Sequence, residues 1–466
     1  MLFYRFGSGG IILVNWAWFL TRLAIGLSIL ALLYLSQRFW YRSIWRLSAN
    51  WGHTGVRVAA RALYLIALLL IIVAIADSVR MDHGRILPRG SLAAVFPGLW
   101  FVSALFSYIL VKVVRGADHC FRWIRSITQP KAPANATNST DSSPEIVPNP
   151  SRRYFFRTAT AAAGAAPFLG VMYGYAAERL RYQVSRVEVP IANLPSPLDG
   201  MKIVQLSDIH LSGYMSPESV RRAVDMANDL GADLAVVTGD LITGSHDSIH
   251  DCIEQIRHLH APLGVWGCNG NHEVYARMED LAQILYAQAG MTLLRQESKQ
   301  LVFKGASFNL LGVDYQRERT PTGRRMQMLT EIEPLVRRDM PNILLSHNPN
   351  SYNRAAELGI ELSLAGHTHG GQVQVEILDH RLSPARFITD YIAGLYSHPI
   401  IREPREVFPH RQSLGSSAAS ISIAERMDAA ARASSLLYVN RGLGTVGAPV
   451  RLGVPPEITL LTLRRA

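Results

Sequence analysis

The segment KIVQLSDIH, residues 202–210, places an apolar run directly before two polar side chains, Asp208 and His210. Short runs rich in Ile, Val and Leu are typical of buried β-strands. Asp208 and His210 are one residue apart, so both side chains can point to the same side of an extended turn. Because loops at strand ends gather side chains into a common site, the segment predicts a strand that delivers both residues to one edge of a sheet.

From about residue 187, short apolar runs alternate with stretches of helical periodicity. This alternation predicts a layered α/β domain over 185–466, in which helices cover the strands. One covering helix is expected at 217–230, with Val220, Ala223, Val224, Met226 and Ala227 on its buried side. The strands are expected at 202–206, 234–238, 264–267, 307–313 and 343–346.

Four further motifs place polar residues at the ends of apolar runs. They are Gly239-Asp240, Gly270-Asn271-His272-Glu273, Ser346-His347 and Gly366-His367-Thr368-His369. Two neighbouring metal ions require oxygen and imidazole donors from several segments, together with one carboxylate that can bridge them. The motifs supply that set of donors, so the sequence predicts a two-metal site. Because the set contains no thiolate, manganese, iron and zinc all suit it.

The order of these motifs resembles the calcineurin-like metallophosphoesterase superfamily over about residues 200–372. Two C-terminal segments, VNRGLGT at 439–445 and PEI at 456–458, resemble the membrane-associated, exported branch of the YkuE and YaeI type. The resemblance implies a four-layer αββα sandwich. An insertion is expected at about 397–434, where the chain is rich in Ser, Ala and Arg.

The resemblance also implies a role for each polar residue. One metal ion would be held by Asp208, His210, Asp240 and His369, and the other by Asp240, Asn271, His347 and His367. Asp240 would therefore bridge the two ions. His272 would donate a proton to the leaving oxygen or stabilise the charged transition state, and Glu273 would orient it.

The activity implied is hydrolysis of a phosphodiester, phosphomonoester or pyrophosphate bond by a metal-activated water. Attachment to a membrane favours an envelope or lipid-linked substrate. A competing hypothesis is an enzyme similar to the UDP-2,3-diacylglucosamine pyrophosphatases of lipid A synthesis, which need a cytoplasmic active site. A noncatalytic scaffold with the same fold is the third hypothesis. The complete set of ligands argues against it, because such proteins tend to lose ligands.

The first 125 residues are expected to form three transmembrane helices. Three apolar segments approach the ~20 residues that a helix needs to cross a bilayer, at about 11–36, 58–78 and 91–114. Residues 126–150, rich in Pro, Ser, Thr and Asn, are expected to form a disordered linker. The stretch 151–178 begins with SRRYFFR and resembles a twin-arginine export signal. An ordinary fourth helix is the alternative, and either would anchor the chain.

The net charge of +11 is distributed unevenly along the chain. Residues 1–190 contain 21 Lys and Arg against 7 Asp and Glu, whereas the remainder is close to neutral. Basic residues beside membrane helices orient those helices, so the excess indicates topology and no nucleic-acid partner is expected. Loops 37–57 and 115–157 are the basic ones. They predict a multi-pass protein of the bacterial inner membrane with its catalytic domain outside the cytoplasm.

Several other residues are given structural roles. Cys120, Cys252 and Cys268 are expected to be buried or unpaired thiols, although Cys252 and Cys268 could pair if the domain is exported. His246 and His250 are expected on a solvated helix face, and Gly442-x-Gly444 suits either a tight turn or a phosphate loop. Arg441 and Arg451 could contact a substrate phosphate, although surface salt bridges are the favoured interpretation.

Overall fold

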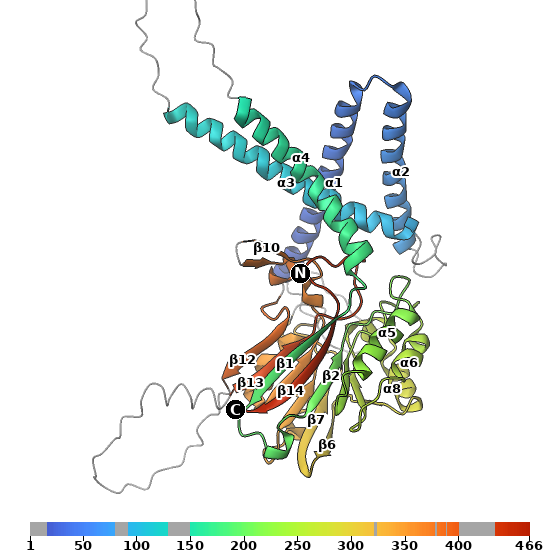
Figure 1. Cartoon of the computed structure of the whole chain (residues 1–466), viewed down its shortest axis with the longest axis vertical. Helices are drawn as coiled ribbons and strands as arrows, with labels where there is room; N and C mark the ends of the chain where they lie inside the picture. The colour runs from blue at the N-terminus through green and yellow to red at the C-terminus, as the bar shows by residue number, and fades with distance from the viewer. Residues whose placement is uncertain are drawn as a thin grey trace, which may run out of the picture. The chain divides into compact units, whose positions relative to one another are not determined.

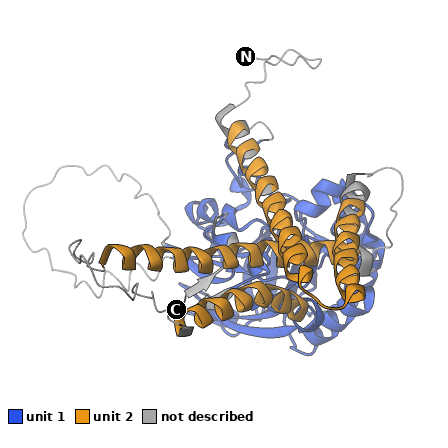
Figure 2. Ribbon diagram, turned by 90° about the horizontal axis from the view of Figure 1, so that it is seen from above, with its two compact units in different colours: residues 1–19, 175–466 blue, residues 20–174 orange. Residues whose placement is uncertain are grey.

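The computed structural model describes residues 16–79, 92–128, 150–320, 324–377, 380–387, 389–399 and 434–466. The chain divides into two units, which Figure 2 shows in different colours. One unit is helical and contains residues 20–174. The other contains the described residues from 175 onward, and its strands make it the α/β unit.

The helical unit has four helices: α1 (Trp16–Ala49), α2 (Thr54–Val79), α3 (Leu92–Thr128) and α4 (Pro150–Tyr173). The first three are long and apolar enough to cross a membrane, and large apolar side chains such as Leu30 and Leu63 are more than 60% exposed on them. Such exposure is costly in water and favourable in lipid. Among the described helices α4 does not reach that apolarity, so its role as an anchor stays a prediction.

The helices extend further than their apolar cores predict. The basic stretches expected to be loops continue α1 to Ala49 and α3 to Thr128, so the expected linker cannot begin at residue 126. Residues 129–149 lie outside the described part of the chain. Polar side chains join the helices, because the indole N–H of Trp40 donates to the carbonyl of Ala104 at 3.1 Å and that of Trp100 donates to Gln37 Oε1 at 3.0 Å.

The α/β unit is built on two six-stranded mixed sheets. The first has the order β1 (Gln183–Ile191), β14 (Glu457–Arg465), β2 (Lys202–Leu206), β3 (Leu234–Thr238), β4 (Val265–Cys268) and β5 (Thr292–Leu293). The second has the order β12 (Gly394–Pro399), β13 (Ser434–Val439), β9 (Leu362–Ala365), β8 (Asn342–Leu345), β7 (Ala306–Gly312) and β6 (Glu297–Phe303). A two-stranded ribbon is formed by β10 (Val375–Ile377) and β11 (His380–Leu382).

Alternate residues of each central strand enter different cores. Ile203 of β2 packs in the core between the two sheets, together with Phe308 and Ile343 of the second sheet. Its neighbour Val204 faces the outer core beneath α5 (Pro217–Asn228), α6 (Ile249–Ile256) and α8 (Glu279–Gln288), as Figure 1 shows. Helix α9 (Tyr352–Leu358) packs on the outer face of the second sheet. The predicted four-layer αββα sandwich is therefore confirmed.

The predicted strands are found to within one residue at each end, because their apolar runs are uninterrupted. The predicted covering helix is α5, which begins after Ser216, whose hydroxyl accepts a hydrogen bond from the N–H of Ser219. The predicted insertion was drawn too widely. Its first residues belong to β12, and its last residue, Ser434, begins β13, with which β12 pairs. Residues 400–433 lie outside the described part of the chain.

Candidate metal centre

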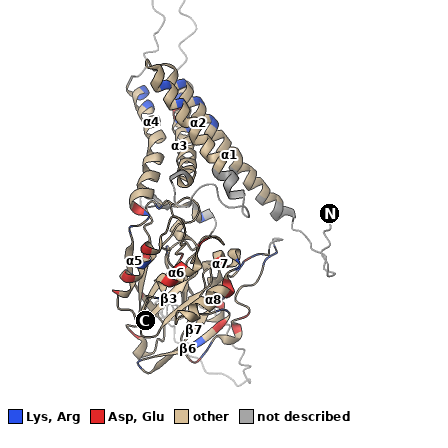
Figure 3. Ribbon diagram, turned by 90° about the vertical axis from the view of Figure 1, so that its right-hand side faces the viewer, with Lys and Arg blue, Asp and Glu red and all other residues tan. Residues whose placement is uncertain are grey.

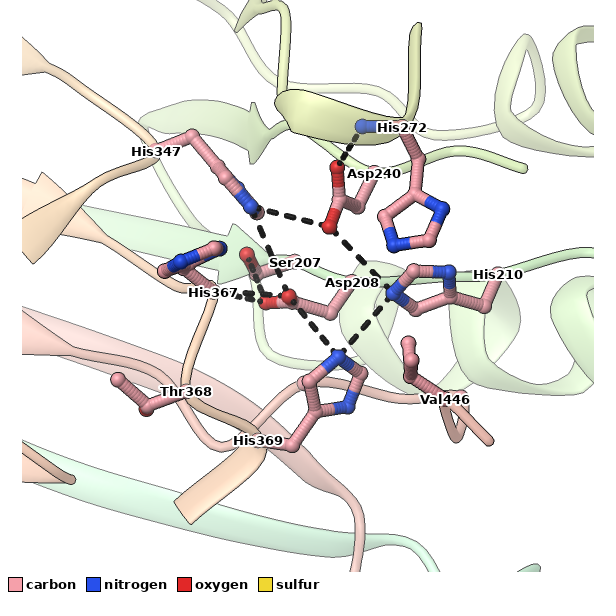
Figure 4. A network of polar contacts seen from close by, with 12 residues as sticks. Ser207, Asp208, His210, Asp240, His272, His347, His367, Thr368, His369 and Val446 are labelled. Atoms are coloured by element: carbon pink, nitrogen blue, oxygen red, sulfur yellow. Dashed lines mark hydrogen bonds and ion pairs between the residues drawn. The ribbon is translucent and has the colours of Figure 1, made fainter. Parts of the chain in front are cut away.

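Seven side chains expected to bind metal come from loops at the carboxyl ends of five strands. Asp208 and His210 follow β2, Asp240 follows β3, Asn271 begins α7 (Asn271–Ala276) after β4, His347 follows β8, and His367 and His369 follow β9. Residues of both sheets share one core, and Figure 4 shows side chains from these loops pointing toward one another. The site therefore draws its donors from both sheets.

One group of donors is formed by Asp208, His210 and His369. His210 Nε2 and His369 Nε2 are 3.1 Å apart, and His369 Nε2 lies 3.3 Å from Asp208 Oδ1. All three side chains are buried, and the two imidazole rings stack with centroids 4.8 Å apart. Such close donor atoms could hold one cation in common.

A second group consists of Asp240, His347 and His367, whose donor atoms are also close enough to share a cation. Asp240 lies between the groups, since its Oδ2 is 3.0 Å from His347 Nε2 and 3.5 Å from His210 Nε2. The donors of His210, Asp240 and His272 make a third group within reach of one cation. Asp240 is thus placed as a carboxylate able to face two cations.

Five of the seven expected ligands have a left-handed backbone. Their φ values are 48° at Asp208, 49° at His210, 55° at Asp240, 73° at His367 and 52° at His369. Residues other than glycine adopt this backbone conformation at a cost of ~1–3 kcal/mol each, so the surrounding structure must impose it. Strain of this kind concentrates at functional sites, where it directs side chains toward one point.

Glycines allow the ligand loops to approach each other closely. A Cβ added at Gly270 would collide with Asp240 Oδ1, and one at Gly366 would collide with Asp208 Oδ2. At Gly442, which follows β13, an added Cβ would lie 2.6 Å from the Cβ of Asp208. Any larger side chain at these positions would push the carboxylates out of place.

Backbone carbonyls set the orientation of two histidines. The Nδ1 atoms of His347 and His272 lie 2.6 Å from the carbonyl oxygens of Thr238 and Thr243, to which Nδ1–H donates. In each ring this leaves the lone pair of the neutral imidazole on Nε2. Among the described residues Asn271 Oδ1 is buried without a hydrogen-bond partner, whereas His347 Nε2 faces Asp240 Oδ2 at 3.0 Å. Because such atoms are costly to bury unsatisfied, the site fits bound cations.

Burial keeps most of the imidazoles neutral. It lowers the pKa of His210 to about 3, that of His367 to about 4 and that of His369 well below its usual value. Neighbouring histidines add to the shift, since two imidazolium ions at this spacing would repel each other. Neutral imidazoles are the form that binds metal.

The carboxylates and His347 form a coupled group. Burial raises the pKa of Asp208 to about 6, despite the opposing charge of His347. Burial also acts to raise the pKa of Asp240, but its charge interaction and hydrogen bond with His347 outweigh burial and hold this pKa below its usual range. The same carboxylates overcome burial at His347 and raise its pKa to about 10. The cluster is therefore poised for positive charge at its centre.

Glu273 was predicted to orient His272, but its carboxylate bonds to backbone groups instead. Its carboxylate is fully buried and accepts hydrogen bonds from three backbone N–H groups, those of Gly270, Asp240 and Leu241, at 2.7–2.9 Å. These bonds join the loops after β3 and β4. Glu273 therefore positions the backbone of Asp240, and the proximity of His272 in sequence was misleading.

Arg451 is neither a surface salt bridge nor a substrate contact. The side chain is completely buried, and its guanidinium donates to the carbonyls of Arg441, Gly442, Gly444 and Val454 at 2.6–3.2 Å. Burial lowers its pKa to about 10, so it stays protonated at neutral pH. The cation thus shapes the loop after β13.

That loop supports the first metal-binding loop directly. The N–H groups of Leu443 and Gly444 donate to the carbonyls of Ser207 and Asp208 at 3.0 and 2.7 Å. The Gly442-x-Gly444 motif is thus a close backbone contact beside the site. Arg441 pairs with Glu457 (Nε to Oε2, 3.1 Å), a carboxylate that is nearly buried. This ion pair is more protected than the surface pair expected for Arg441.

The remaining expectations have mixed outcomes. His246 and His250 are both exposed as predicted, but His246 lies in the loop before α6, so the two histidines do not share a helix face. The three cysteines are free, with Cys252 and Cys268 buried.

Two residues around the centre were not singled out from the sequence. Ser207 Oγ donates to Asp208 Oδ2 at 2.6 Å, and the ring of Tyr315 lies 5.5 Å from that of His367. Ser207 immediately precedes the D-x-H motif, and that position could have suggested it. Tyr315 follows β7 with no distinguishing motif, so no signal in the sequence pointed to it.

Comparisons with known proteins agree with this geometry. Residues 201–371 match the family described as calcineurin-like phosphoesterase. The chain is 28% identical over 323 residues to the uncharacterized metallophosphoesterase YkuE of Bacillus subtilis (strain 168), a match that covers 67% of this chain and 98% of that protein. It is 27% identical over 268 residues to an uncharacterized metallophosphoesterase of Helicobacter pylori (strain J99), covering 56% and 60% of the two chains.

One relative, from an animal, is named as a transmembrane protein. The transmembrane protein with metallophosphoesterase domain of Bos taurus is 30% identical over 294 residues, which is 61% of this chain and 57% of that protein. This chain thus spans little more than half of that relative. The motifs, the double sheet and these matches together show that the chain contains a calcineurin-like metallophosphoesterase domain, the domain of a hydrolase of phosphoric ester bonds, and that it is similar to YkuE.

Proposed function

We propose that this protein is a membrane-anchored phosphoesterase that uses two divalent metal ions, manganese, iron or zinc, to cleave a phosphodiester, phosphomonoester or pyrophosphate bond. The observation that supports this most strongly is the convergence of buried donors from both sheets, together with the unpartnered Oδ1 of Asn271 among the described residues. One ion would be held by Asp208, His210, Asp240 and His369, and the other by Asp240, Asn271, His347 and His367.

The bound ions would polarise the phosphoryl oxygen and lower the pKa of a nucleophilic water. The chain supplies the remaining chemistry. The carboxylate of Asp240 lies close to His210 of one donor group and His347 of the other, so it sets the distance between the two groups. The backbone N–H of His272 donates to Asp240 Oδ1 at 2.9 Å. The Nδ1–H of its ring donates to the carbonyl of Thr243. His272 Nε2 is then the atom that would first take up a proton and then pass it to the leaving oxygen.

The test uses the full chain purified in detergent. After chelation, the apoprotein is assayed against bis(p-nitrophenyl) phosphate, p-nitrophenyl phosphate and a pyrophosphate diester, with manganese, iron or zinc added separately. We expect no turnover without metal and restored turnover of at least one substrate with metal. Turnover that survives chelation and ignores added metal would contradict the two-metal proposal.

An envelope or lipid-linked substrate is the second element of the proposal. Three helices able to cross a membrane belong to the same chain, and anchoring confines an enzyme to substrates at that surface. The name of the bovine relative likewise joins a transmembrane protein to this domain. A lipid-linked pyrophosphate and its water-soluble analogue should therefore differ in kcat/KM when the chain is reconstituted in bilayers, with the lipid-linked form preferred.

We further propose that the α/β unit lies outside the cytoplasm of a bacterial cell. The basic residues at the ends of α1 and α3 support a cytoplasmic location for those ends. An alkaline phosphatase fused after residue 200 should then be active, whereas one fused in 49–54, between α1 and α2, should be inactive. The opposite pattern would favour a cytoplasmic pyrophosphatase similar to those of lipid A synthesis.

A further inference from the structure

The helical unit contains a hollow of about 380 Å³ between α1 and α3, which we term the basic hollow. Its lining includes five cationic side chains: Arg38, Arg42, Arg46, Lys112 and Arg115. No acidic residue lines it. Figure 3 shows that the basic residues of the helical unit gather at one end of it.

The spacing of the cations makes them converge. Arg38, Arg42 and Arg46 are four residues apart and lie on one face of α1, while Lys112 and Arg115 are three apart on α3. The orientation of membrane helices depends on how many basic residues flank them, and it does not require those residues to surround one hollow. Convergence therefore needs a further explanation.

The five cations lack anionic partners among the described residues. Helix α1 contains no acidic residue, and the one in α3, Asp118, is already paired with Arg122 at 3.3 Å and Arg152 at 2.5 Å. Like charges so close together repel each other. An anion in the hollow would remove that repulsion.

Two aromatic side chains also line the basic hollow. Phe39 and Tyr108 lie with ring centroids 5.5 Å apart. The guanidinium carbon of Arg115 is 5.6 Å from the Phe39 ring, and Lys112 Nζ is 5.8 Å from the Tyr108 ring. These contacts hold two of the cations above an apolar surface. The ligand should thus combine an anionic group with an apolar part.

The depth of the basic hollow matches the boundary between lipid tails and headgroups. Residues 23–37 of α1 and 92–111 of α3 carry no charge, and Arg38 and Lys112 are the first charged residues after them. Runs of this kind occupy the hydrocarbon core, so the cations begin where headgroups begin. Lipid phosphates lie at that depth.

We infer that the basic hollow binds the phosphate group of an anionic phospholipid. The five cations surround the phosphate, and the ring pair of Phe39 and Tyr108 contacts the glycerol and the first acyl carbons. Inorganic phosphate offers the same charge but has no apolar part for the rings. The site is separate from the proposed catalytic centre and does not depend on it.

The experiment measures equilibrium binding of fluorescent dioctanoyl phosphatidylglycerol to the full chain in neutral detergent, with dioctanoyl phosphatidylcholine and inorganic phosphate as competitors. The test variant is Arg42→Gln combined with Lys112→Gln. The matched control is Arg57→Gln combined with Arg153→Gln, which removes the same charge from the helical unit outside the lining. All variants are checked for an unchanged melting temperature and elution volume, and Arg38→Gln with Arg115→Gln serves as a second test pair.

We expect the test variants to bind phosphatidylglycerol about 10- to 30-fold more weakly, and the control to change by less than about threefold. Neither phosphatidylcholine nor millimolar phosphate should compete appreciably with the wild-type chain. Equal losses in the test and control variants would overturn the inference, because net charge alone would then explain binding. Full competition by inorganic phosphate would overturn the lipid assignment.

Discussion

Asp240→Asn is expected to abolish turnover and to weaken both metal sites. The substitution keeps the shape of the side chain but removes the charge that the proposed ions share, and it places an amide where Oδ2 faces His210 and His347. Loss of one partner in a buried set of charges costs ~3–5 kcal/mol, and a loss of this size in the transition state would lower kcat/KM by about 10²- to 10⁴-fold. Metal content per chain, measured by elemental analysis after gel filtration, should fall below that of the wild type.

The control for this substitution is Asp229→Asn, because Asp229 is an exposed aspartate at the end of α5. It should bind metal and turn over substrate like the wild type. If Asp240→Asn retained two metals per chain with unchanged kinetics, Asp240 could not be the bridging ligand.

His272→Ala is expected to separate chemistry from metal binding. Its ring lies against that of His210, with centroids 4.7 Å apart, but its Nδ1–H is held by Thr243 and the resemblance assigns it no ligand role. The variant should keep its metals and its melting temperature. The loss should appear in kcat, on the order of 10²–10⁴-fold if His272 acts as a general acid.

Dependence on the leaving group provides the sharper measurement. An aryl ester with a good leaving group needs little protonation, whereas an alkyl ester needs much, so the defect should be larger for the alkyl ester. His250→Ala, at an exposed position in the first turn of α6, is the matched control and should leave both rates unchanged. Equal defects on both esters would favour electrostatic stabilisation, and loss of metal would make His272 a ligand, as its position near His210 and Asp240 also permits.

Much of the fold could be predicted because its signals are local. Lys202–Leu206 and Leu234–Thr238 are strands with the predicted bounds, since each run ends at a small residue, Ser207 or Gly239, that directly precedes an expected ligand. The ends of the transmembrane helices were less predictable, because α1 continues through Arg38, Arg42 and Arg46 to Ala49. A charge ends the apolar segment of such a helix without breaking its backbone hydrogen bonds.

The residues that the structure gathers at the candidate site could be predicted from the sequence, but the residues that hold their loops in place could not. Asp208 and His369 could be expected at one edge of a sheet because each follows a strand end. Glu273 and Arg451 act on backbone atoms far away in sequence, and such partners leave no spacing to recognise. The role expected for Arg451 was wrong because an arginine can be buried where carbonyls replace its water.

The sequence by itself determined the class of fold, the order along the chain of the polar motifs that follow the strands, and the set of side chains able to bind metal. Apolar periodicity and residue chemistry are both properties of short segments. Only the tertiary structure decided how those segments meet. It brought Asp240 between His210 and His347 and imposed left-handed backbones on most of the expected ligands. It also gathered cations of α1 and α3 around one hollow. These arrangements depend on packing between residues far apart in the chain, which local sequence does not encode.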